Sequence, residues 1–227
     1  VKIINLGKVA TPFCLWYSQK YHVDAVMITA SHNPKDQNGL KVYSRKSGAV
    51  DKNSGLLKVK ARLDKLDFNL RPVDIKSAQS FFIKGNTAKA FLEYNRYLAN
   101  QSKGLNPKLK VALDFSNGMV AGELVSVFEK YGLNFLTINE VPNGNFPDHG
   151  PNPLEEANQK SIQALMKSKK FDLGAIFDGD GDRVLFFDEK SEAVDPSFIF
   201  SALIDFYLKK RDSAVQNAAL GKIIKEV

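Results

Sequence analysis

Cysteine is nearly absent from this sequence, in which Cys14 is the only one among 227 residues. A lone cysteine cannot form an internal disulfide, and such usage is typical of proteins from a reducing compartment. Cys14 lies in an apolar stretch without a neighbouring cysteine, which favours a buried, unreactive side chain over a reactive thiol. We therefore expect a cytoplasmic protein.

Long hydrophobic runs are absent too, because no segment approaches the roughly 20 apolar residues that a membrane-spanning helix needs. Membrane association is therefore not expected. Residues 1–4 show neither an initiator methionine nor the features of a secretory signal. We expect the chain to be part of a longer polypeptide, and its length favours two compact domains over one.

Charge is distributed unevenly along the chain. Residues 1–103 contain 18 Lys and Arg against 7 Asp and Glu, whereas residues 104–227 contain 14 against 18. A basic first half suits an anionic partner such as nucleic acid, an acidic membrane surface or a phosphorylated small molecule, although solvated surface lysine explains most of these residues. Nucleic-acid binding is disfavoured because no recognisable motif interleaves aromatic and basic residues.

The spacing of apolar residues predicts an α/β fold, with two three-layer α/β/α domains and mostly parallel mixed sheets. Strands are predicted at residues 23–29, 40–44, 110–115, 134–138, 173–177 and 184–187, with a further strand beginning at 222–224. Helices are predicted at residues 12–21, 87–101, 120–131, 153–168 and 196–209, while residues 51–77 show no clear period. Thr11 is the predicted N-cap of the first helix, with Pro12 at the first helical position.

Three aspartates alternate with two glycines in an acidic loop, Asp178, Gly179, Asp180, Gly181 and Asp182. On a flat strand the outer carboxylates would lie roughly 13 Å apart, which is too far for one cation to bind all three. Each glycine can adopt a positive φ and let the backbone curl until the carboxylates converge. Converging oxygen ligands of this kind predict a Mg²⁺ site, beside which Arg183 can bind a phosphate oxygen.

The same loop is similar to an EF-hand calcium loop, in which Glu189 would take the twelfth position. The sixth position of that loop requires glycine and here holds Arg183, and the flanking segments are predicted strands rather than helices. A calcium loop is therefore disfavoured. A purely solvated acidic turn is also disfavoured, because unpaired carboxylates this close together would repel one another.

Ser31 and His32 follow the predicted strand 23–29 and precede Asn33 and Pro34, a pair that predicts a turn. Adjacent side chains in extended structure point to opposite sides and no G-x-S-x-G motif is present, so a serine hydrolase is not indicated. Ser31 should instead lie at the rim beyond a strand end, where α/β sheets bind ligands. Simple exposure of a loop serine is the alternative.

These segments resemble, in order and spacing, the α-D-phosphohexomutase superfamily, and within it the bacterial and archaeal phosphomannomutase/phosphoglucomutase family. The resemblance rests on four motifs: TASHNP at 29–34, NGLK at 38–41, GNFP with PNP at 144–153, and DGDGDR at 178–183. It implies that Ser31 carries the catalytic phosphoryl group and, with the three aspartates of the acidic loop, binds Mg²⁺. Lys41 matches the general acid/base, which would need its pKa lowered by nearby positive charge. His32 and Arg183 match positions that orient the substrate and support the active-site phosphate.

The activity so implied interconverts hexose 1-phosphate and hexose 6-phosphate, of mannose or glucose, through a phosphoserine and a hexose 1,6-bisphosphate. Small hexose phosphates are the implied partners, with no nucleic acid and no membrane. The resemblance divides the chain into an N-terminally incomplete phosphoserine domain at 1–104, a metal-binding domain at 105–195 and the start of a sugar-binding domain at 196–227.

The family's Gly-Glu-x-Ser-Gly and Arg-x-Ser-Gly-Thr loops do not occur in this sequence. We therefore expect little multiple-turnover activity from residues 1–227 alone. A non-catalytic binding module that retains the fold is the alternative, and metal binding together with phosphorylation of Ser31 would distinguish the two. For His149, in the loop 142–153, a structural role is favoured over a role in linking the domains.

Overall fold

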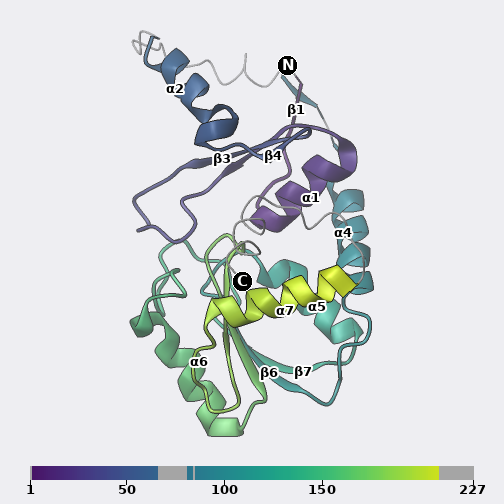
Figure 1. Ribbon diagram of the computed structural model, residues 1–227, viewed down its shortest axis with the longest axis vertical. Coiled ribbons are helices and arrows are strands. Elements are labelled where there is room, and N and C mark those ends of the chain that lie inside the picture. Colours follow the sequence, from purple (N-terminus) through teal and green to yellow (C-terminus); the bar gives the residue numbers. More distant parts are fainter. Residues whose placement is uncertain (1, 66–80, 84, 210–227) are drawn as a thin grey trace.

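The computed structural model describes residues 2–65, 81–83 and 85–209, and the α/β class is confirmed (Figure 1). We call residues 2–101, as far as they are described, the first unit and residues 110–188 the second unit. The first unit holds the loop with Ser31 and the second holds the acidic loop. Among the described residues, no helix combines the length and the apolar character that crossing a bilayer requires.

The second unit is built on a four-stranded sheet in the order β7-β6-β8-β9. Its strands are β6 (Lys110–Asp114), β7 (Asn134–Ile138), β8 (Leu173–Phe177) and β9 (Val184–Phe187). Strands β7 and β8 pair parallel with β6, and β9 pairs antiparallel with β8. The parallel pairs are possible because the helices α5 (Ala121–Lys130) and α6 (Glu156–Lys169) return the chain to the same sheet edge.

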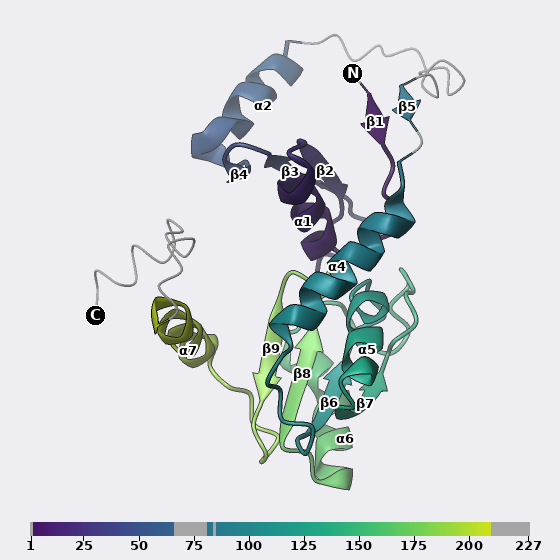
Figure 2. The same cartoon turned by 90° about the vertical axis from the view of Figure 1, so that its right-hand side faces the viewer.

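Both faces of this sheet are packed, because successive side chains of a strand point to opposite faces. Ala112 of β6 and Ile176 of β8 contribute to a buried cluster with α6, whereas Leu113 and Ala175 contribute to a second cluster with α5. The helices therefore cover the sheet from two sides, which gives three layers (Figure 2). This packing fixes the strand ends that carry the acidic loop.

The first unit contains two small sheets. Strands β2 (Ala25–Ile28), β3 (Leu40–Ser44) and β4 (Gly48–Ala49) form one, and β1 (Ile3–Ile4) pairs with β5 (Phe82–Ile83) in the other. Helix α1 (Thr11–Tyr21) packs between the larger sheet and α4 (Thr87–Gln101), and a π-helical turn, η1 (Lys52–Leu56), leads into α2 (Leu57–Leu63).

An aromatic cluster holds α1 against α4. The ring centroids of Phe13 and Tyr94 lie 5.2 Å apart, and those of Trp16 and Tyr94 also lie 5.2 Å apart. Contacts at this separation add to the free energy that the buried rings already contribute. The core of the first unit is therefore made mainly between two helices.

The structure adds detail to the predicted fold and differs from several predicted bounds. The sheet of β2, β3 and β4 is antiparallel, because the loop 29–39 contains no helix that could carry the chain back to the same edge. Thr11 is the first residue of α1 rather than its N-cap, since Ala10 takes that position. Helix α6 begins at Glu156 rather than near residue 153.

The helix predicted at residues 196–209 is confirmed as α7 (Pro196–Lys209), which lies apart from the four-stranded sheet (Figure 2). The strand predicted to begin at residues 222–224 lies outside the described residues, as does part of the unassigned segment 51–77. The predicted domain boundaries at 104/105 and 195/196 stay a prediction.

Candidate active site

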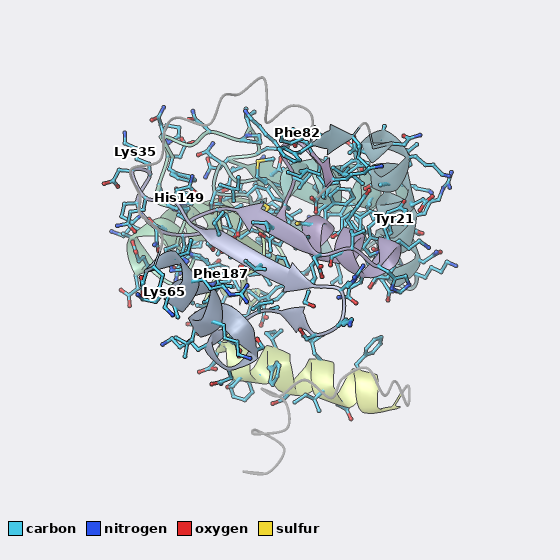
Figure 3. The ribbon with its side chains drawn as sticks, turned by 90° about the horizontal axis from the view of Figure 1, so that it is seen from above. Tyr21, Lys35, Lys65, Phe82, His149 and Phe187 are labelled. Carbon is cyan, nitrogen blue, oxygen red and sulfur yellow. The ribbon has the colours of Figure 1, made fainter. Side chains whose placement is uncertain are left out.

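Ser31 lies in the loop that joins β2 to β3, and its backbone is left-handed, with φ of 57°. This conformation is uncommon for a residue with a side chain, and residues held in it cluster at functional sites. The amide of Ser31 donates to Thr29 Oγ1 at 2.8 Å, and that of Asn33 donates to the carbonyl of Ala30 at 3.0 Å. The loop then runs outwards, and Lys35 points away from the molecule in the view from above (Figure 3).

The acidic loop curls back on itself between β8 and β9. The amide of Arg183 donates to Asp178 Oδ1 at 3.1 Å, and the amide of Gly181 donates to the carbonyl of Asp178 at 3.1 Å. Gly181 has φ of +74°, as the sequence predicted. Gly179 does not have a positive φ. Glycine is required there for a different reason, because a Cβ at this position would lie 2.7 Å from the backbone oxygen of Ser31.

The three aspartates among the predicted metal ligands converge, since one oxygen from each of Asp178, Asp180 and Asp182 lies within 4.8 Å of the other two. Asp178 and Asp180 are buried, and Asp182 is exposed. Within the described part of the chain, Asp180 Oδ1 is buried without any hydrogen-bond partner. A buried, unpaired carboxylate oxygen beside two other carboxylates fits a hard divalent cation such as Mg²⁺.

Ser31 meets the acidic loop directly. Its hydroxyl donates to Asp178 Oδ2 at 2.6 Å, although 147 positions separate the two residues in the sequence. A cavity of about 370 Å³ opens beside this contact, and its lining includes Asn117 and Gly118 of the turn after β6. No local pattern in the sequence indicates that Asn117 and Gly118 belong to the site.

Thr11, which the sequence predicts as a helix N-cap, contributes to the site instead. Its hydroxyl donates to Asp180 Oδ2 at 2.7 Å, and its amide donates to the backbone oxygen of Asp180 at 2.9 Å. Thr11 therefore acts across the two units instead of capping its own helix. The Thr11-Pro12 pair marked a helix start correctly, but nothing local indicated the partner.

Lys41 extends from β3 to the acidic loop, where Nζ donates to Asp180 at 2.7 Å and to Asp182 at 2.5 Å. Burial alone would lower the pKa of Lys41, but the hydrogen bonds to these two carboxylates outweigh burial and raise it. In this arrangement negative charge surrounds the amine, and the lowering of this pKa by positive charge at the site stays a prediction.

The buried carboxylates respond to their surroundings in opposite directions. Burial, together with the negative charge of Asp180 and Asp182, raises the pKa of Asp178 to about 6. Burial also acts to raise the pKa of Asp180, but hydrogen bonds from Lys41 and Thr11 lower it overall. Asp180 is thus held as a carboxylate, the form that binds a cation.

His32 and Arg183 are brought together at the rim of the site, with Nε2 of the histidine 3.3 Å from Nη1 of the arginine. A guanidinium can only donate, so Nε2 is the acceptor in this contact. Nδ1 of His32 is buried and has no partner among the described residues. Arg183 is exposed, and its guanidinium is therefore accessible to an anion.

His149, in contrast, forms its hydrogen bonds with other residues of the second unit. Its Nε2 lies 2.9 Å from Asp114 Oδ2, and its Nδ1 lies 2.8 Å from the carbonyl of Gly150. These contacts fix the loop 142–153 to the end of β6, which is the structural role that the sequence favoured.

Comparison with known proteins agrees with this arrangement. Residues 1–70 match the model of phosphoglucomutase/phosphomannomutase α/β/α domain I, and residues 89–191 match that of α/β/α domain II. The chain belongs to this family, and so to the α-D-phosphohexomutase superfamily. The predicted resemblance is confirmed.

Two curated relatives illustrate the similarity. A phosphomannomutase of Vibrio cholerae is 29% identical over 224 residues, which cover 94% of this chain and 46% of the relative. A phosphoglucosamine mutase of Clostridium kluyveri is 28% identical over 226 residues, which cover 99% of this chain and 49% of the relative. The chain thus spans about half the length of the curated relatives that it matches.

Solved structures show the same fold. A putative phosphomannomutase from Thermus thermophilus superposes with a TM-score of 0.74 at 20% identity, covering 92% of this chain and 47% of that one. A phosphoglucomutase/phosphomannomutase family protein from Burkholderia thailandensis superposes with a TM-score of 0.72 at 21% identity, covering 93% of this chain and 45% of that one. The α/β/α architecture of the chain is therefore that of the family.

Proposed function

We propose that this chain carries the phosphoryl-transfer centre of a phosphohexomutase, which interconverts hexose 1-phosphate and hexose 6-phosphate. The observation that carries the proposal is the hydrogen bond between Ser31 Oγ and Asp178, which joins a hydroxyl of one unit to the carboxylate cluster of the other. The names of the relatives and of the family support a hexose phosphate substrate, with mannose, glucosamine and glucose phosphates as the class.

In the proposed reaction, Ser31 Oγ carries a phosphoryl group that faces the sugar. A bond forms between phosphorus and the free sugar hydroxyl oxygen while the bond between phosphorus and Ser31 Oγ breaks. The hydroxyl proton passes to a base, and the product is a hexose 1,6-bisphosphate. This intermediate then returns its other phosphoryl group to Ser31, which leaves the isomeric monophosphate and restores the phosphoserine.

Asp178, Asp180 and Asp182 would hold Mg²⁺, whose chemistry is to neutralise charge on the phosphoryl oxygens. The unpaired Asp180 Oδ1 supports this assignment. Arg183, beside His32 at the rim, binds a phosphate oxygen. Positioning and charge neutralisation of this kind supply most of the acceleration in phosphoryl transfer.

Lys41 is the proposed proton-transfer residue. Its contacts with Asp180 and Asp182 favour the ammonium, which is the form that donates a proton. To accept the proton of a sugar hydroxyl, Nζ has to leave both carboxylates. Proton transfer is thus coupled to rearrangement of the pair of ion contacts that Lys41 makes.

The test is the intact mass of the chain after incubation with Mg²⁺ and a hexose 1,6-bisphosphate. The wild type gains the mass of one phosphoryl group, and Ser31→Ala gains none. Ser47→Ala, at an exposed serine of the same unit, gains it like the wild type. A wild-type chain that neither binds Mg²⁺ nor gains this mass would overturn the proposal and favour a non-catalytic binding module.

A further inference from the structure

Glu123 is a buried acid that the proposed reaction does not use. It lies in the first turn of α5, and only 2% of its surface is exposed. Glutamate is rarely buried to this extent unless it is paired. Its Oε1 accepts a hydrogen bond of 2.9 Å from the amide of Ala10, across 113 positions of sequence.

The partner of Glu123 stands directly before a residue of the site. Ala10 is the N-cap residue of α1, and its amide is one of the groups that a helix start leaves without a partner in its own helix. The next residue, Thr11, donates its hydroxyl and its amide to Asp180. Glu123 and Asp180 therefore hold adjacent residues of the same helix start.

Close packing leaves little room for this helix start to shift. Ala10 is fully buried, and Val120, which precedes α5, is 4% exposed. A Cβ on Gly181 of the acidic loop would lie 2.8 Å from Val120 Cβ and 3.6 Å from Ala10 Cβ. Loss of the Ala10 contact would thus be transmitted to Thr11 and the acidic loop, because interiors this dense transmit displacement.

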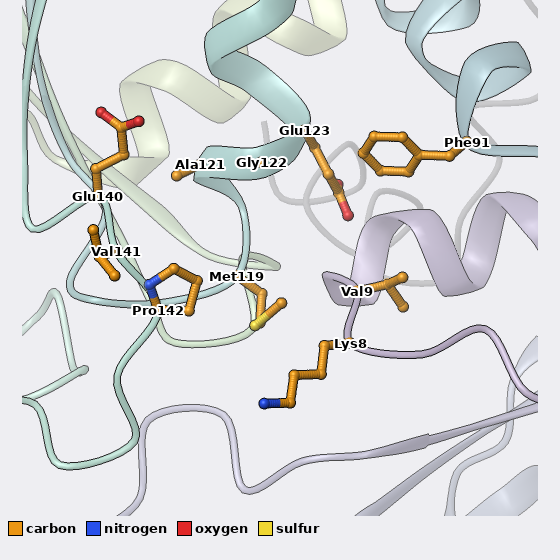
Figure 4. A pocket seen from close by; sticks show the side chains of 10 residues that line it. All are labelled: Lys8, Val9, Phe91, Met119, Ala121, Gly122, Glu123, Glu140, Val141 and Pro142. Atoms are coloured by element: carbon orange, nitrogen blue, oxygen red, sulfur yellow. The ribbon is translucent and has the colours of Figure 1, made fainter. Parts of the chain in front are cut away.

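A cavity of about 320 Å³ separates the two units beside this contact. Figure 4 shows Glu123 pointing from α5 towards Val9 and Phe91 of the first unit, with Lys8 and Glu140 as the other charged residues of the lining. The bond from Ala10 to Glu123 thus joins the two units at the edge of this cavity.

Tyr94, on α4, interacts electrostatically with Glu123. Burial raises the pKa of Glu123 to about 7, so the neutral acid is readily formed. Glutamine therefore reproduces the shape of this side chain and its acceptor oxygen, and leucine removes the acceptor.

We propose that Glu123 is a positioning residue, which fixes the start of α1 so that Thr11 presents its hydroxyl to Asp180 of the acidic loop. The effect of Glu123 on metal binding at the site rests on the proposed function. The hydrogen bond between Ala10 and Glu123 does not, so the bond and its effect on metal binding can be tested separately.

The experiment compares Glu123→Leu with Glu123→Gln in the whole chain. The first readout is the dissociation constant for Mn²⁺, used as a paramagnetic substitute for Mg²⁺ and measured by electron paramagnetic resonance. Glu123→Leu should weaken Mn²⁺ binding about tenfold, as expected for residues that hold metal ligands in place. Glu123→Gln should restore the wild-type value, and Glu129→Leu, at the exposed end of α5, should also match the wild type.

The second readout is amide hydrogen exchange at Ala10 and Thr11, followed by NMR. Exchange at both amides should accelerate in Glu123→Leu and return to the wild-type rate in Glu123→Gln. Wild-type Mn²⁺ affinity and exchange in Glu123→Leu would overturn the proposal, as would equal effects of the two substitutions. If Glu123→Leu does not fold, Glu123→Met replaces it, because methionine keeps the length of glutamate and packs adaptably.

Failure of the proposed function has a different signature. In that case the wild-type chain would neither bind Mn²⁺ nor accept a phosphoryl group. Amide exchange would then decide the role of Glu123 alone: acceleration in Glu123→Leu but not in Glu123→Gln supports the positioning contact, and unchanged exchange overturns it.

Discussion

The two units support their parts of the site in different ways. The acidic loop joins strands whose side chains are packed on both faces, and Ile176 of β8 is fully buried. Ser31 follows β2, where Ile28 is 67% exposed, and Leu40 opposite it on β3 is 66% exposed. The acidic loop is therefore held by the core of its own unit, whereas the position of the serine hydroxyl depends on contacts that cross between the units.

The contacts across the site are mainly polar. They run from the first unit to the acidic loop, to Arg183 beside it and to α5, and include Ser31 to Asp178, Lys41 to Asp180 and Asp182, Thr11 to Asp180, His32 to Arg183, and Ala10 to Glu123. Such contacts are specific in direction but contribute only modest net free energy each. The comparison thus separates the stability of the sheet that carries the acidic loop, which comes from packing on both of its faces, from the alignment of the site, which comes from contacts between the units.

Matched isoleucines on the two sheets should show the largest difference in stability. Ile176→Ala, in the core of the second unit, should lower the free energy of unfolding by about 2–5 kcal/mol. Ile28→Ala, on the exposed face of β2, should lower it by less than about 1 kcal/mol. Urea unfolding of both variants measures the difference. Equal losses would show that the two sheets are equally well packed and would break the comparison.

Gly179→Ala should affect alignment rather than stability. The new Cβ would lie 2.7 Å from the backbone oxygen of Ser31, so the serine loop has to move away from the acidic loop. A displacement of this size should slow phosphorylation of Ser31 about 100-fold. The rate is followed by intact mass with a hexose 1,6-bisphosphate.

Gly122→Ala is the control for this substitution. A Cβ there meets no atom within 4 Å, so phosphorylation should proceed at the wild-type rate. A wild-type rate in Gly179→Ala would contradict the close approach of the two loops.

His149→Gln should remove a pH-dependent part of the stability of the second unit. Burial acts to lower the pKa of His149, but the hydrogen bond to Asp114 outweighs burial and raises it. The stabilisation is therefore complete below the unfolded-state pKa, about 6.5, and is lost as the pH rises through the higher folded-state pKa. At low pH the substitution should cost about 1–3 kcal/mol, because it removes a hydrogen bond to a buried carboxylate.

The measurement is urea unfolding at a series of pH values for the wild type, His149→Gln and His22→Gln, the last at an exposed histidine. The wild-type and His149→Gln curves should converge as the pH rises, and the His22→Gln curve should follow the wild type. Curves for wild type and His149→Gln that stay parallel would show that this histidine does not titrate with folding.

The smallest effect is expected at the surface of the first unit. Lys60 and Asp64 form an exposed ion pair on α2, with Nζ 2.9 Å from the carboxylate. Lys60→Ala should change the free energy of unfolding by no more than about 0.5 kcal/mol, because water and salt screen exposed pairs. Lys58→Ala on the same helix serves as the control, and a loss well above that of the control would show that α2 contributes to stability.

Much of the fold could be predicted from the sequence because its signals are local. The bounds of β3, β8 and α4 match the predicted residues, since apolar spacing and turn residues at their ends define each of them. The acidic loop was also predictable, because alternating aspartate and glycine carry the chemistry and the required curvature together. The antiparallel pairing of β2 and β3 depends on the path of the loop 29–39, which the spacing of apolar residues does not define.

The contacts between the units could not be predicted in the same way. Thr11 and Asp180 are 169 positions apart, and Ala10 and Glu123 are 113 apart, so no local pattern connects either pair. The direction of the Lys41 pKa shift depends on the same contacts, because the charges that the folded chain places around the amine determine it. The packing of the two units determines these contacts and the charges around Lys41. The spacing of residues in a single sequence does not show which distant residues will meet.

The central claim, that Ser31 and the acidic loop form one metal-dependent centre, is tested most directly by ³¹P NMR of the chain phosphorylated at Ser31. Added Mn²⁺ should broaden the phosphoserine signal strongly, because the ion and the phosphate share the site, and Asp180→Asn should abolish the broadening. A phosphoserine signal that stays sharp while the wild-type chain binds Mn²⁺ would place the ion elsewhere and contradict the account.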